Sequence, residues 1–194
     1  MPIVDTNPRQ LRGPWTVGFA LDRHTIGSVF LGYYPNGRPI FDTQRPPVGQ
    51  LLYQLKYRND TKAIEPLADT AEDFLRNFWR LRVDAIVPVP PSNVRSIQPV
   101  MVVADALAAR LGVPVCTACL MKVKETPQLK DITDYDKRKE ALVGAFAVTA
   151  ELTAGKNLLL FDDVHGSGAT VSHIAEILRT QGGATVYLLT LTTK

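Results

Sequence analysis

Two adjacent carboxylates followed by a glycine-rich turn form the segment of this sequence with the clearest chemistry. Residues 158–170 read LLLFDDVHGSGAT, so an apolar run ends at Asp162 and Asp163 and a turn with two glycines follows. Carboxylates only accept hydrogen bonds, which suits a pair of vicinal hydroxyls. Backbone amides at the start of a helix, left accessible by glycine, bind phosphate oxygens. This order of groups predicts a ribose 5-phosphate, with its diol on the aspartates and its phosphate in the turn.

Other phosphate-binding motifs do not fit this sequence. It contains no G-x-x-x-x-G-K-[ST], and no G-x-G-x-x-G with an acid about twenty residues later. An acidic pair at a strand end is common by itself, and so is a glycine turn that only connects a strand to a helix. Their combination in this order favours a ligand site.

The elements around this segment predict an α/β protein. Strand patterns at 83–90, 113–123, 156–161 and 184–193 alternate with helical patterns such as 97–112 and 170–183. This alternation is typical of a doubly wound parallel sheet covered by helices on both faces. Ligands of such sheets bind beyond the carboxyl ends of the strands, where the two aspartates are expected to lie.

The first 45 residues have a different pattern. Apolar runs at 15–22, 27–34 and 38–43 surround an Asn-Gly turn, which predicts antiparallel strands and a hairpin. Helical patterns follow, the longer one over 62–81. We therefore expect a small N-terminal antiparallel β appendage, residues 1–45, and an α/β domain, residues 46–194.

Composition limits the classes of function. The 194 residues fit one domain, and 45% hydrophobic and 21% charged residues are typical of globular proteins. A net charge of +3, from 22 basic and 19 acidic residues, is too small to indicate nucleic-acid binding by electrostatics alone. Neither a signal peptide nor a membrane span is expected, because the most apolar stretches are short or interrupted by charges.

The two cysteines, Cys116 and Cys119, form a C-x-x-C. Two thiols without a further cysteine or histidine at finger spacing do not complete a zinc site. On a strand over 113–123, residues three apart point to opposite faces. We therefore expect two separate small side chains, and the low cysteine content favours a cytoplasmic protein.

Segment 158–170 resembles the phosphoribosyl-diphosphate (PRPP) signature of type I phosphoribosyltransferases, which joins a hydrophobic strand, an acidic pair and a phosphate loop. Other stretches resemble the ComF-type, competence-associated branch: LLYQLKYRND (51–60), DAIVPVPPS (84–92), ETPQLKDIT (125–133), KRKEALVGAFAV (137–148) and VYLLTLT (186–192). That branch usually begins with a four-cysteine zinc ribbon, and carries an arginine-rich segment with R-G-F-N-Q after the Pro-Val-Pro turn. This chain lacks the ribbon and keeps only Arg95 and Gln98 of the second segment, which weakens a DNA-uptake role.

The resemblance implies binding of PRPP or a nucleoside 5′-phosphate, and transfer of the phosphoribosyl group to an acceptor that the sequence does not identify. PRPP is expected at Asp162, Asp163, Val164, His165, Gly166, Ser167, Gly168, Ala169 and Thr170. The departing diphosphate is expected at Pro90, Pro91, Ser92, Asn93 and Arg95. Mg²⁺ is the implied cofactor, held mostly by substrate oxygens, with Asp162 and Asp163 acting indirectly through ribose hydroxyls or water.

Four residues are candidates for catalysis: Asp163, His165, Lys122 and Lys124. The two lysines precede a polar stretch, 125–139, with the length of a mobile lid. In related transferases a loop there closes over PRPP with a cation; ordinary surface lysines are the alternative. Purine-salvage relatives carry an aspartate base at the position of Gly166, and here the neighbouring His165 could accept the proton unless its ring faces solvent.

Two classes of function stay open. One is an enzyme, favoured by the acidic pair and the lysines; the other is a PRPP- or nucleotide-binding protein without turnover, in regulation or DNA handling, favoured by Gly166. A weaker third is binding of single-stranded DNA through Lys56, Arg58, Lys62, Arg76, Arg80 and Arg82. No membrane partner is expected, and a homodimer is compatible with the sequence.

Overall fold

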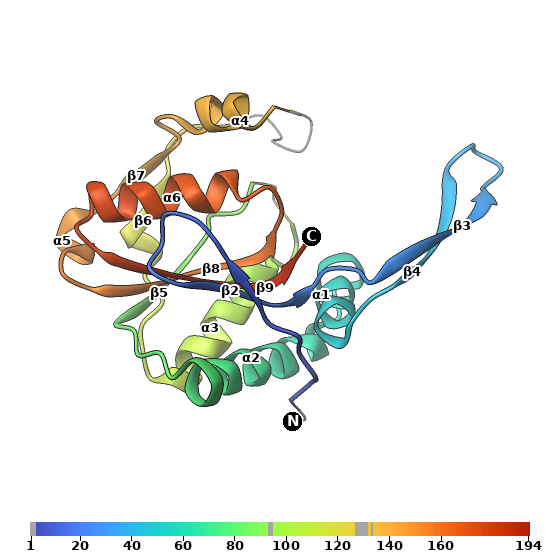
Figure 1. Ribbon diagram of the computed structural model, residues 1–194, viewed down its shortest axis with the longest axis horizontal. Coiled ribbons are helices and arrows are strands. Elements are labelled where there is room, and N and C mark those ends of the chain that lie inside the picture. The colour runs from blue at the N-terminus through green and yellow to red at the C-terminus, as the bar shows by residue number, and fades with distance from the viewer. Residues whose placement is uncertain (1–2, 93–94, 127–131, 133) are drawn as a thin grey trace.

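A five-stranded sheet, in the order β1-β2-β9-β8-β5, forms the centre of the computed structural model, which describes residues 3–92, 95–126, 132 and 134–194 (Figure 1). The strands are β1 (Arg9–Leu11), β2 (Gly18–Arg23), β5 (Ala85–Pro88), β8 (Asn157–His165) and β9 (Thr185–Thr193). Only the β1–β2 pair of this sheet is antiparallel; β2–β9, β9–β8 and β8–β5 are parallel. The chain thus has the predicted α/β fold with a mostly parallel sheet.

Helices cover both faces of this sheet. The helices α1 (Pro47–Arg58), α2 (Ile64–Asp73) and α3 (Pro99–Leu111) lie on one face and α6 (Ala169–Thr180) on the other (Figure 1). Along β8, Leu158 and Leu160 belong to the core beneath α6, while Leu159 and Phe161 belong to the core beneath α1–α3. Because both faces are buried there, the strand is apolar from Leu158 to Phe161.

The predicted helices form where their end signals place them. The helix α3 has Pro99 at its first position and ends at Gly112, whose φ of +70° is the left-handed conformation that favours glycine. The helix predicted over 62–81 forms in three segments: a 3₁₀ turn (Thr61–Ala63), α2, and a wider π-helical segment (Phe74–Trp79).

The N-terminal strands pair differently from the prediction. The strands β3 (Gly27–Tyr33) and β4 (Pro39–Gln44) form the expected hairpin as a separate two-stranded sheet, which projects from the body (Figure 1). The strand β2, expected to be antiparallel to this hairpin, pairs in parallel with β9 instead. Its Ala20 and Leu21 are fully buried, so the central sheet supplies the contacts that the hairpin does not. A domain boundary at residue 45 stays a prediction, although β2 is a strand of the central sheet.

The prediction of one strand over residues 113–123 is wrong for the middle of this range. Val115 makes an isolated bridge to Ile86, then Thr117–Cys119 form a 3₁₀ turn. This turn brings the Cα atoms of Cys116 and Cys119 to 5.3 Å, and the two residues form a disulfide. The expectation of separate thiols depended on the alternation of a strand, which a helical turn replaces.

The remaining elements lie beside α6. A short antiparallel ribbon joins β6 (Leu120–Lys122) to β7 (Phe146–Val148), and the helices α4 (Tyr135–Leu142) and α5 (Ala150–Thr153) stand before and after β7. Among the residues that the structure describes, no helix has the length and apolar character needed to cross a membrane.

Candidate functional site

The glycine-rich turn has the geometry of a phosphate cradle. The strand β8 continues to His165, and the chain then turns through residues 166–168 into α6. Gly168, directly before α6, has a φ of +77°, and a Cβ added there would lie 2.8 Å from His165 Nε2. Glycine is therefore required on both counts. Within the described chain α6 has no side-chain N-cap, which leaves amides of its first turn for a ligand.

The two aspartates at the end of β8 have different neighbours. Asp163 Oδ2 accepts a hydrogen bond from Lys56 Nζ of α1 at 2.7 Å, and the two side chains form an ion pair. Asp162 Oδ1 accepts from the amide of Asp163 at 2.8 Å. Burial, followed by the nearby charge of Asp163, raises the pKa of Asp162 to about 8. The ligand-free site therefore holds one carboxylate paired with a lysine and one carboxyl group that keeps its proton at neutral pH.

Two adjoining cavities surround these groups. One, of about 400 Å³, follows the turn and includes Asp162 and residues 164–171. The other, of about 510 Å³, lies between the ends of β5 and β8 and α1. Five residues line both cavities: Asp162, Val164, Gly166, Thr170 and Lys194. A ligand that spans the turn and the strand ends therefore has a continuous space.

The predicted diphosphate residues lie in the second cavity. The β5–β8 ladder extends to Val89, whose amide donates to Phe161 O at 2.9 Å, so residues 90–92 leave the sheet beside the aspartates. Pro90, Pro91, Ser92 and Arg95 line the cavity, while Asn93 lies outside the described residues. Arg95 Nη1 donates to Lys56 O at 3.3 Å, and its guanidinium lies 5.6 Å from the centre of the Tyr57 ring.

The two candidate lid lysines lie apart from this site. Lys122 ends β6 and Lys124 is exposed two residues later; neither is among the described residues that line the two cavities. The polar stretch 125–139 lies partly outside the described residues, at 127–131 and 133. A role for either lysine stays a prediction.

His165 is held beneath the turn. Its ring packs edge-on against Trp15, with centroids 6.2 Å apart, and it lines the cavity at the turn. Burial lowers the pKa of His165 below 6.5, so the imidazole is neutral at pH 7 and has one nitrogen able to accept a proton. The ring is half-buried, so the alternative of a solvent-facing side chain does not describe it.

Four residues that line the cavities lie outside the aspartate-and-glycine motif: His24, Lys56, Arg138 and Lys194. His24 Nδ1 lies 3.1 Å from Thr192 Oγ1, and burial, with the charge of Lys56, lowers the pKa of His24. Arg138, from α4, lines the cavity at the turn. Lys56 and Arg138 belong to two of the stretches that resemble the ComF-type branch, 51–60 and 137–148, whereas nothing local in the sequence identifies His24 or Lys194.

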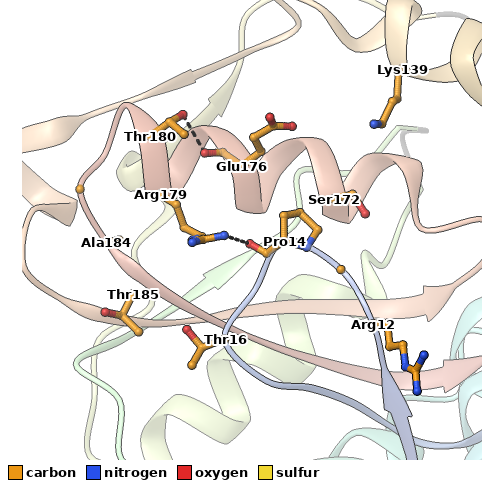
Figure 2. Close-up of a pocket in the computed structure, with 12 residues that line it drawn as sticks. Arg12, Pro14, Thr16, Lys139, Ser172, Glu176, Arg179, Thr180, Ala184 and Thr185 are labelled. Carbon is orange, nitrogen blue, oxygen red and sulfur yellow. Dashed lines mark hydrogen bonds between the residues drawn. The ribbon is translucent and has the colours of Figure 1, made fainter.

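A larger cavity lies elsewhere, along α6 (Figure 2). It measures about 830 Å³, and its charged lining residues are Arg12, Lys139, Glu176 and Arg179. Arg179 Nη1 donates to Pro14 O at 3.0 Å, which ties α6 to the segment before β2 (Figure 2). This cavity contains neither the aspartates nor the glycine turn, so size does not identify the chemical site.

No family model and no curated protein matches this sequence. Among solved structures, the chain is similar to adenine phosphoribosyltransferase from Saccharomyces cerevisiae at 16% identity and a TM-score of 0.47, covering 84% of this chain and 83% of that one. The enzyme of the same name from Trypanosoma brucei, solved with AMP, pyrophosphate and ribose-5-phosphate, gives 13% identity, a TM-score of 0.47 and coverages of 97% and 86%. The enzyme from Leishmania tarentolae gives 11% identity and a TM-score of 0.44, covering 97% of this chain and 95% of that one. At these values, function has to be inferred from the residues of this chain.

Proposed function

We propose that this chain is a type I phosphoribosyltransferase, of the ComF-type branch, that transfers the phosphoribosyl group of PRPP to an acceptor and releases diphosphate. One observation carries the proposal. The acidic pair, the accessible amides of α6 and the basic group Lys56–Arg95 converge at one edge of a parallel sheet, on two adjoining cavities. A diol, a monophosphate and a diphosphate would each have a matching set of groups there.

The 5-phosphate of PRPP binds at residues 166–170, because Gly168 leaves room for its oxygens at the amides of α6. The ribose diol then reaches Asp162 and Asp163. The diphosphate extends into the second cavity, towards Ser92, Arg95 and the ammonium of Lys56. This order follows the order of the groups along the sheet edge.

The side chains at the site fit a Mg²⁺ ion that is held mainly by oxygen atoms of the bound substrate. No cluster of three or more His, Cys, Asp or Glu suited to a metal occurs in the described part of the chain. Burial and the charge of Asp163 raise the pKa of Asp162, and the charge of Lys56 offsets this only in part. A divalent cation near the pair would favour ionised Asp162, acting through ribose hydroxyls or water. When bound, Mg²⁺ would neutralise the charge that builds up on the leaving diphosphate.

The residues of the chain supply the rest of the reaction. Breaking the bond between C1 and the diphosphate oxygen leaves positive charge on the ribose, which the carboxylates of Asp162 and Asp163 stabilise. Neutral His165 is the group near the turn that takes a proton from the acceptor. Lys122 and Lys124, which precede the stretch 125–139, close over the diphosphate together with it. The acceptor lies where the two cavities adjoin, between His165 of the first and His24 and Tyr57 of the second.

The second candidate is a protein that binds PRPP or a nucleotide without turnover, in regulation or DNA handling. Two observations favour it. Gly166 provides no side chain where a base could stand, and the ring of His165 is held against Trp15 rather than directed freely at the second cavity. In addition to these two observations, Lys56 already forms an ion pair with Asp163 when no ligand is bound.

Diphosphate release from PRPP and Mg²⁺ tests the proposal, with nucleobases, anthranilate-like acids and ammonia as acceptors. We expect release with at least one acceptor, and its loss in Asp163→Asn. Asp105→Asn, an exposed carboxylate on α3, is the matched control and should keep the activity. Binding of PRPP by calorimetry without release from any acceptor would favour the second candidate, and no binding would overturn both.

A further inference from the structure

The β3–β4 hairpin is an arm that the rest of the chain does not cover. The two strands pair only with each other among the described residues, and the arm extends away from the central sheet and its helices (Figure 1). Its base is closed by the amide of Ile26, which donates to Gln44 O at 2.9 Å. A two-stranded hairpin is marginally stable in water without a further layer to pack against. The arm therefore lacks the layer that a stable hairpin needs.

One face of this arm carries an aromatic cluster. Phe30 lies opposite Phe41 in the register, with ring centroids 5.7 Å apart, and Tyr33 lies 5.0 Å from Phe30. The register shifts between Phe30 and Gly32, and this bulge puts Tyr33 on the same face as Phe30. The three rings are 50%, 68% and 53% exposed for Phe30, Tyr33 and Phe41. We call these three residues the aromatic face.

The exposed area of the aromatic face is that of an apolar patch with a function. If each ring offers about 200 Å², the three together expose about 350 Å² per copy. The largest apolar patch of a typical monomer is about 300–600 Å² and is often functional, whereas a standard interface buries about 800 Å² per partner. The flanking Ile26, Leu31 and Tyr34 are each more than half exposed and would add to this area.

The sequence of the arm fits a second copy of the same chain. Of the thirteen exposed large apolar side chains in the described structure, seven lie within residues 26–41, so the best apolar complement on another copy is its own arm. Residues 26–34 contain no charge that would repel the same segment of that copy. A twofold interface joins a patch to itself, which such a surface allows.

We propose that the aromatic face is the dimerisation surface of this protein, packed against the aromatic face of a second copy across a twofold axis. Phe30, Tyr33 and Phe41 of each arm are buried in this contact, and each hairpin becomes the second layer of the other. Burial of these rings drives the association, since nothing else covers them.

The opposite face of the arm provides a matched control. Val29 is adjacent to Phe30 and 58% exposed, but it lies opposite Asp42 on the other side of the hairpin. Phe30→Glu and Phe41→Glu place a charge in the proposed contact, from β3 and β4 respectively. Val29→Glu places the same charge one residue away, outside it. All three positions are exposed in the single chain, so each variant should keep the fold.

The oligomeric state of the full chain, measured by sedimentation and light scattering from low micromolar to submillimolar concentration, tests the proposal. The parent and Val29→Glu should have the mass of two chains, whereas Phe30→Glu and Phe41→Glu should raise the dissociation constant at least about thirtyfold. Circular dichroism checks that each variant is folded. A parent that stays a single chain throughout, as expected if another protein covers the arm, would overturn the proposal. So would a dimer that survives both aromatic substitutions, or one that Val29→Glu disrupts equally.

Discussion

Asp162 and Asp163 are adjacent, yet their surroundings give them different charges. Lys56 pairs with Asp163, whereas partly exposed Asp162 has a raised pKa in the ligand-free chain. Under the proposed function Asp162 is ionised beside Mg²⁺, and both carboxylates accept hydrogen bonds from the ribose diol. Asp162→Asn or Asp163→Asn should therefore weaken PRPP binding at least tenfold, about 1.4 kcal/mol, because hydrogen bonds to a charged acceptor are lost. Calorimetry with Mg²⁺ measures this, with Asp105→Asn as control; unchanged affinity in both variants would rule out the ribose assignment.

The raised pKa of Asp162 also predicts how stability depends on pH. Its pKa rises from an ordinary 3.8 to about 8 in the folded chain. Between these values the folded state holds a proton on Asp162 that the unfolded state has lost, so the contribution of Asp162 to folding stability falls as pH rises from about 4 to about 8. Asp162→Asn cannot ionise, and its stability should fall less over this range. Urea unfolding of the ligand-free parent and variant at several pH values compares the two; parallel curves would contradict the assignment.

At the scale of elements, the sequence predicts what depends on neighbours along the chain. The strand β8, the turn after it and the helices α3 and α6 follow from apolar periodicity and from end signals such as Pro99 and Gly112. The parallel pairing of β2 with β9 depends on residues far apart in sequence, and no local pattern encodes it. The same holds for the site. The aspartates and the glycine turn can be recognised in the sequence, whereas His24 reaches the second cavity only through the fold.

The turn between β8 and α6 is the element in which an added side chain tests the phosphate site directly. Gly168 has a positive φ, and any Cβ there meets His165 Nε2. Gly168→Val should abolish PRPP binding by filling the phosphate position, while the strain, of order 1–3 kcal/mol, leaves a folded protein because the turn is at the surface. Ligand titration beside thermal melting separates these effects. Gly166→Ala, whose Cβ would meet nothing within 4 Å, is the control for folding. Parental affinity in a folded Gly168→Val would show that this turn does not hold the phosphate.

At the scale of the whole molecule, the site joins segments that are distant along the chain. Lys56 comes from α1, Arg95 from the segment after β5, and Asp163 from β8, and their contacts close the edge of the sheet. A ligand that bridges these segments binds the folded state and not the unfolded chain. Its binding free energy is therefore added to the stability of the whole fold.

This linkage yields a test that needs no knowledge of the acceptor. With Mg²⁺ present, a nucleoside 5′-monophosphate at about 100 times its dissociation constant should add about 2.7 kcal/mol to the free energy of unfolding. For a chain of this size that raises Tm by about 5–10 °C. The matching nucleoside should shift Tm little, because it has no group for the amides of α6. Gly168→Val should lose the shift with the nucleotide, measured against the Tm of the same variant without ligand. Equal shifts from nucleoside and nucleotide would mean that residues 166–170 only connect β8 to α6.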